Sequence, residues 1–68
     1  HDTFVLINIY NVKGELINTL VNEQKLQGLH SVNWIGIDNQ SREVSSGTYF
    51  LSVTAGDYSN ISKIILLK

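Results

Sequence analysis

The chain has 68 residues, with five basic and six acidic side chains and no cysteine. A chain of this length buries only about 60% of the surface that it exposes when unfolded, so it forms at most one small domain of marginal stability. The near-zero net charge excludes the basic patch of a nucleic-acid binder, and the lack of cysteine excludes disulfides and thiolate zinc sites. The longest apolar runs fall far short of the ~18 residues that span a bilayer, so we expect no membrane span.

The first predicted strand is Phe4–Tyr10, where β-branched and aromatic residues alternate with the others and place Val5, Ile7 and Ile9 on one face. The residues from Asn11 to Gly14 are typical of a tight turn. They predict a hairpin with the apolar run that follows.

That second run, Leu16–Val21, carries an internal conflict. Ile17 and Leu20 are three positions apart, so they cannot face one core on a regular strand. Either a β-bulge or an end of the strand after Asn18 resolves the conflict. The polar residues from Asn22 to Gly28 predict a connection.

A third strand is predicted at His30–Trp34, because His30, Val32 and Trp34 alternate. The polar stretch from Gly36 to Arg42 predicts a loop, and Val44 marks the start of a short strand.

Two further strands complete the pattern. Thr48–Ala55 places Tyr49, Leu51 and Val53 on one face, as in an antiparallel strand with one wet side. The Gly56-Asp57 pair predicts a turn, and Tyr58–Leu67 forms the last strand. Turn residues recur every ~8 to 14 positions, which is typical of a small β-sandwich. We therefore expect five to seven strands, with a core of Ile7, Ile9, Val32, Trp34, Tyr49, Leu51 and Val53.

Several short motifs follow one another in a distinctive order and spacing along the chain: Ile9-Tyr10-Asn11, Gly14, Leu20-Val21, Gly28-x-His30, Trp34-x-Gly36-x-Asp38, Val44-x-Ser46-Gly47-x-Tyr49-Phe50, Ala55-Gly56-Asp57 and Lys63-x-x-Leu66-Leu67-Lys68. This order resembles the C-terminal sorting domain of proteins exported by the type IX secretion system. That family is similar in turn to the immunoglobulin-like domain of the flagellar hook-capping protein. The chain departs from the pattern at Ile35, where the family usually has an acidic residue, at Ser41, where it often has glycine, and in having no proline.

The resemblance implies an all-β fold, a small antiparallel immunoglobulin-like β-sandwich that lacks its first strand or strands. Residues 1–68 then form a single module at the C-terminal end of a larger secreted bacterial protein. It implies a non-catalytic sorting or attachment module, read by the outer-membrane secretion machinery or packed against neighbouring domains, and located outside the cell or on its surface. The residues that the resemblance marks for sorting and recognition are Gly47, Tyr49, Lys63, Leu66, Leu67 and Lys68.

Two alternatives remain open for the function as a whole. The module is a structural immunoglobulin-like accessory domain of a secreted hydrolase or of a hook-capping protein, or it is a carbohydrate-binding module. For the second, Trp34, Tyr49 and Phe50 would have to form an aromatic platform, whereas their alternation favours core packing for the first two and an outward position for Phe50.

No residue pattern points to catalysis, a metal or a cofactor. The six carboxylates lie beside predicted turns, where solvated surface positions are the norm. His30 has no second histidine at a metal-ligand spacing, so we expect it to pack or to hydrogen-bond on its strand. Asp38–Ser41 lacks the alternating acidic ligands of a calcium loop, and we expect an Asx turn there instead.

Overall fold

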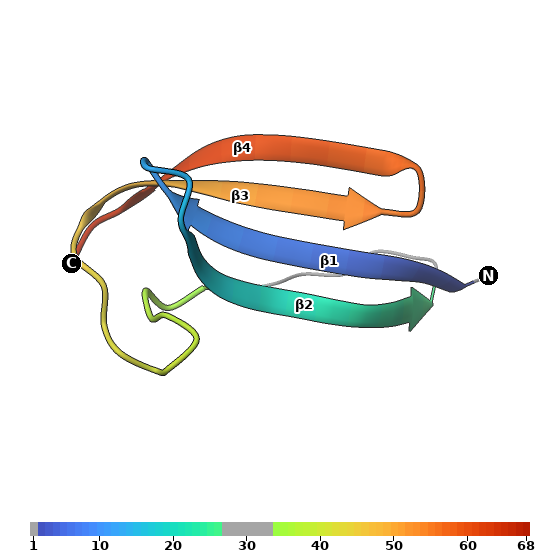
Figure 1. Cartoon of the computed structure of the whole chain (residues 1–68), viewed down its shortest axis with the longest axis horizontal. Helices are drawn as coiled ribbons and strands as arrows, with labels where there is room; N and C mark the ends of the chain where they lie inside the picture. Colours follow the sequence, from blue (N-terminus) through green and yellow to red (C-terminus); the bar gives the residue numbers. More distant parts are fainter. Residues whose placement is uncertain (1, 27–33) are drawn as a thin grey trace.

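A computed structural model describes residues 2–26 and 34–68. Within these residues the chain forms four strands, β1 (Asp2–Asn11), β2 (Leu16–Leu26), β3 (Gly47–Ala55) and β4 (Tyr58–Leu66). All pairs are antiparallel, and the strands lie in the order β2-β1-β3-β4 in one sheet (Figure 1). The described residues contain no helix, which confirms the all-β class expected from the sequence.

The sheet consists of two hairpins joined side by side through β1 and β3. The β1–β2 turn is closed by Asn11, whose side-chain Oδ1 accepts hydrogen bonds from the backbone N–H groups of Lys13 and Glu15, both at 2.9 Å. Gly14 adopts a φ of 83° in this turn, a conformation that suits glycine. The predicted hairpin and its turn are confirmed.

Strand β2 is longer than the sequence predicted. Residues 22–26 were expected to form a connection, yet they pair with β1 in a continuous register. Asn22 and Glu23 are exposed, and pairing with β1 supplies the backbone hydrogen bonds that make the extended form stable. The prediction of a connection starting at Asn22 is therefore wrong.

The conflict within β2 is resolved by bulges. The register of the β1–β2 pair shifts twice, and Leu20 is the extra residue at the first shift and Ile17 at the second. Each bulge turns the strand so that side chains three apart can approach the same face. Of the two sequence-based solutions, the bulge is correct and the early end after Asn18 is wrong.

One face of the sheet, which we call the inner face, carries Ile7 and Ile9 of β1 and Tyr49, Leu51 and Val53 of β3. Ile9 is completely buried and Tyr49 is 6% exposed. The other predicted core residues in the described part, Ile7, Trp34, Leu51 and Val53, are half-buried. Val32, like His30 and the rest of the predicted strand before Trp34, lies outside the described residues.

Residues 34–46, which we call the crossing segment, lie against one end of the inner face (Figure 1). They contain no strand of their own, only an isolated bridge between Ile37 and Glu43. Trp34 therefore does not lie in a strand. The short strand predicted to start at Val44 is also wrong, because Val44 lies in neither a strand nor this bridge. In the described residues, the layer opposite the sheet is this segment, and the strand count is four rather than five to seven.

Candidate functional site

The residues of the Trp34-x-Gly36-x-Asp38 motif gather where the crossing segment meets the sheet. The ring of Trp34 packs edge-on against that of Tyr49, with 5.1 Å between ring centroids and 71° between planes. The Tyr49 hydroxyl donates to the backbone carbonyl of Ser45 at 2.6 Å. A tyrosine that bonds to backbone a few residues upstream is the tyrosine corner of immunoglobulin-like sandwiches. Here it fixes the entry of the crossing segment into β3.

A single carbonyl group ties this segment to β2. The Ile37 carbonyl oxygen accepts from Trp34 Nε1 at 2.8 Å and from Asn18 Nδ2 at 2.7 Å. Asn18 is 9% exposed, a rare position for an amide unless it is hydrogen-bonded. It lies between the two bulged residues of β2. The bulges thus aim a polar side chain at the crossing segment.

Asp38 closes the next turn on itself. Its Oδ1 accepts from the backbone N–H groups of Gln40 at 2.9 Å and Arg42 at 3.0 Å, while Oδ2 accepts from Arg42 Nε at 3.1 Å. The hydrogen bond from the Arg42 backbone is the main cause that lowers the pKa of the Asp38 carboxyl, with the Gln40 backbone and the Arg42 side chain adding to it. The predicted Asx turn is confirmed, and both carboxylate oxygens are engaged inside it.

The neighbour of Asp38 then binds the edge of β2. The Asn39 backbone N–H donates to the Ile17 carbonyl, and the Asn39 side-chain Oδ1 accepts from the Thr19 backbone N–H, both at 3.0 Å. One residue of the crossing segment therefore pairs with β2 much as another strand would.

Gly36 lies against Leu66 and Lys68 near the end of the chain. It is buried with a φ of 80°, and a Cβ at this position would lie 3.2 Å from Leu66 Cδ2 and 3.2 Å from Lys68 Cε. Lys68 also donates through its backbone N–H to Ser46 Oγ at 3.0 Å and through Nζ to Glu43 at 3.3 Å. The last residues of the chain are thus part of the crossing-segment packing.

A hollow of about 280 Å³ remains on the inner face beside these contacts, lined by Ile7, Ile9, Leu20, Trp34, Leu51, Ile64, Ile65 and Leu66. Its lining is almost entirely aliphatic apart from Trp34. Among the described residues that line it, none has a carboxylate, an imidazole or a hydroxyl group that could activate a substrate.

The six residues marked for sorting and recognition do not form one surface. Gly47 pairs with Leu66 across β3 and β4, and Tyr49 is buried beside them. Lys68 reaches back to the crossing segment, whereas Leu67 is 85% exposed. Lys63 pairs with Phe50 on the opposite, outer face of the sheet. Their role in sorting stays a prediction.

The aromatic side chains are divided between the two faces in the same way. Trp34 and Tyr49 pack on each other at the inner face, as their alternation predicted. Phe50 lies on the outer face and is half-buried. The three rings therefore do not form the flat platform that a carbohydrate-binding module would need.

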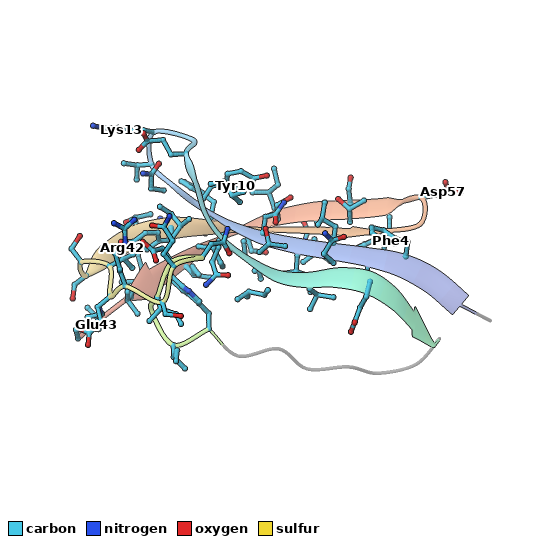
Figure 2. All side chains as sticks on the ribbon, turned by 60° about the horizontal axis from the view of Figure 1, so that its bottom comes forward. Phe4, Tyr10, Lys13, Arg42, Glu43 and Asp57 are labelled. Carbon is cyan, nitrogen blue, oxygen red and sulfur yellow. The ribbon has the colours of Figure 1, made fainter. Side chains whose placement is uncertain are left out.

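Figure 2 shows the charged side chains of the described residues spread over the surface, with Lys13 and Asp57 at opposite turns and Arg42 and Glu43 on the crossing segment. Among the described residues, no three histidine or carboxylate side chains lie together in a way that could hold a metal ion. In the same part of the chain no helix is long and apolar enough to cross a membrane.

Sequence reasoning missed Asn18 and the structural use of Lys68. Asn18 interrupts an apolar run on a predicted strand, and such a polar residue at a bulge was the available signal. Nothing in the sequence indicated that Lys68 folds back over Gly36, because the two residues lie 32 positions apart.

Comparison with known proteins agrees with this architecture. No curated protein and no solved structure showed a significant match to the chain. The family model of the FlgD Ig-like domain matches residues 3–59, which include β1 from Thr3, β2, the crossing segment, β3 and the first two residues of β4. This confirms the hook-capping half of the resemblance seen in the sequence, while nothing in the comparisons supports the type IX sorting half. The chain belongs to the FlgD Ig-like domain family.

Proposed function

We propose that the chain is a non-catalytic structural module, an immunoglobulin-like accessory domain that links or positions parts of a protein assembly outside the cell, as a hook-capping domain does. The observation that carries the proposal is the set of hydrogen bonds that the motif residues form. The polar groups of Trp34, Asp38 and Tyr49 all bind within the crossing segment. Groups engaged in this way hold a fold together and are not free to bind or transform a substrate.

The partners in this proposal are neighbouring domains of the same protein or of the assembly. Its support is the outer face of the sheet, where large apolar side chains are left partly exposed, among them Phe4 at 50% and Ile61 at 69%. Apolar side chains that gather on one face favour contact with another protein surface.

The test compares two variants in the intact parent protein. Trp34→Ala removes the ring that packs on Tyr49, whereas Asp38→Asn keeps an oxygen that can still close the turn. For a structural module, the first variant lowers the amount of assembled protein outside the cell and the second leaves it near the wild-type level. Full loss of function in a folded Asp38→Asn variant would instead show that the carboxylate does chemistry.

A second candidate is the sorting module of the type IX route. It is favoured by one feature, the exposure of Lys63 and Leu67 near the end of the chain. A secretion machine needs accessible side chains, and these two take no part in the crossing-segment contacts.

The sorting hypothesis calls for point variants rather than a deletion. Removing residues 64–68 would also remove Leu66 and Lys68, which pack on Gly36, so loss of export would reflect misfolding. In a reporter fusion expressed in a bacterium with the type IX route, the folded variants Lys63→Glu and Leu67→Ser should stop export if sorting is the function. Normal export of both would dismiss it.

A further inference from the structure

The sheet has two edges, β2 and β4, and the structure treats them differently. The edge of β2 is broken by two bulges and is bound by Asn39 at the Ile17 carbonyl and the Thr19 N–H. Bulges and a covering segment are the usual protection against pairing with another strand. Over its nine residues β4 pairs with β3 without any register shift.

The backbone groups of β4 that point away from β3 follow from the register of the sheet. The Gly56 N–H donates to the Phe4 carbonyl of β1 at 3.3 Å. Because the backbone groups of successive strand residues point to opposite sides, the N–H and C=O groups of even-numbered residues in β3 point toward β1 and those of odd-numbered residues point toward β4. Odd residues of β3 pair with even residues of β4, as Leu51 does with Ser62. The N–H and C=O groups that point to the open side of β4 therefore belong to Ser59, Ile61, Lys63 and Ile65.

The side chains of these four residues make the same edge attractive for pairing. All four are exposed, with Ile61 at 69% and Ile65 at 58%. Lys63 is the only charged residue in the strand. A regular edge with two exposed isoleucines and one charge offers little resistance to strand addition.

We propose that β4 pairs with β4 of a second copy of this chain, antiparallel and about a two-fold axis at Ile61. This register places Ile61 opposite its own counterpart and Lys63 opposite Ser59 of the second copy. Lys63 then lies diagonally across from Asp57 of the second copy, within reach of a long side chain. A two-fold axis at Lys63 would instead oppose two like charges, which is destabilising.

The expected association is weak. A contact made by one strand and its flanking side chains buries less surface than the ~1,200 Å² at the low end of stable interfaces. We therefore expect a two-fold symmetric dimer that dissociates on dilution. In this dimer the sheets of the two copies join through β4 into one continuous sheet.

Sedimentation equilibrium on the 68-residue chain, up to about millimolar concentration, tests this pairing. Wild type should show an average mass that rises with concentration. The variants Ile61→Lys and Ile61→Glu, each alone, should raise the dissociation constant at least tenfold, because like charges then meet at the axis. Mixing the two variants in equal amounts should restore association, since opposite charges then meet. Circular dichroism confirms that each variant is folded.

Two controls identify the edge as the contact. Phe4→Lys adds the same charge to the outer face of central strand β1, at a side chain of similar exposure, and should leave the dissociation constant unchanged. Lys63→Pro removes an N–H that points to the open side and should abolish association while the fold persists. A wild-type chain that stays monomeric at millimolar concentration would overturn the proposal, as would equal weakening by Phe4→Lys or no rescue on mixing the Ile61 variants.

Discussion

The two ends of the sheet differ in what holds them together. At the end where β3 begins, Ile9 and Tyr49 are buried and Asn18 binds the crossing segment. At the end with the β3–β4 turn, the first six residues of β4 are all exposed, and Figure 2 shows Asp57 there on the outside of the turn. Among the residues that the structure describes, burial and side-chain hydrogen bonds are therefore concentrated at one end, and we expect stability to follow the same division.

The largest difference should come from one isoleucine at each end. Ile9→Ala removes a completely buried side chain and should cost ~3 to 4 kcal/mol in the free energy of unfolding. The matched variant Ile61→Ala changes a side chain that is 69% exposed and should stay within ~0.5 kcal/mol of wild type. Urea unfolding followed by Trp34 fluorescence measures both. Similar losses for the two variants would refute the division.

The packing of Trp34 can be separated from its hydrogen bond. Trp34→Ala should cost ~3 kcal/mol, the lower end for a large aromatic ring, because Trp34 is only half-buried. Trp34→Phe keeps a ring against Tyr49 but loses the donor to Ile37, so it should cost less. Unfolding is followed here by circular dichroism. A Trp34→Ala variant as stable as wild type would mean that the ring is a surface contact for a ligand.

Two glycines allow the contact at Leu66 to be measured. Gly36 and Gly14 have nearly equal φ values of 80° and 83°, yet a Cβ at Gly36 would lie 3.2 Å from Leu66 Cδ2 while one at Gly14 meets nothing within 4 Å. Gly14→Ala should cost only the ~1 kcal/mol of the left-handed backbone, and Gly36→Ala ~2 kcal/mol because of the added crowding. Equal losses in chemical denaturation would show that Leu66 and Lys68 give way easily.

The tyrosine corner should have a smaller effect. Tyr49→Phe keeps the ring beside Trp34 and removes only the hydroxyl that donates to Ser45. A single hydrogen bond of this kind contributes ~1 kcal/mol, and the Ser45 carbonyl can turn to water. Thermal unfolding should show a small drop in midpoint with unchanged cooperativity. A loss as large as that of Trp34→Ala would mean that the corner controls the whole crossing segment.

The last and smallest effect depends on pH. Because the folded state lowers the pKa of Asp38, its carboxylate contributes stability that is fully present above the ordinary value near pH 4. That contribution is lost as the pH falls from there through the lower pKa of the folded state. In Asp38→Asn the corresponding part of the acid-side decline should disappear when unfolding midpoints are compared between pH 6 and about pH 2. An unchanged pH profile would contradict the assignment.

Several elements could be read directly from the sequence because they depend on local pattern. The alternation of Val5, Ile7 and Ile9 predicted β1, and the Gly56-Asp57 pair predicted the β3–β4 turn. The Asx turn at Asp38 also depends only on neighbours within four residues. Side-chain period and turn chemistry are properties of short segments, so they survive without knowledge of the rest of the fold.

What only the tertiary structure decided depends on contacts between distant residues. The sequence from Asn22 to Gly28 predicts a connection, but pairing with β1 makes residues 22–26 part of a strand. The resemblance marks both Lys63 and Lys68 for sorting, but the structure places Lys63 on the outer face of the sheet and Lys68 against Gly36 of the crossing segment. Propensity reports what a residue prefers alone, whereas strand register, bulges and the approach of Lys68 to Gly36 are set by which segments pack together.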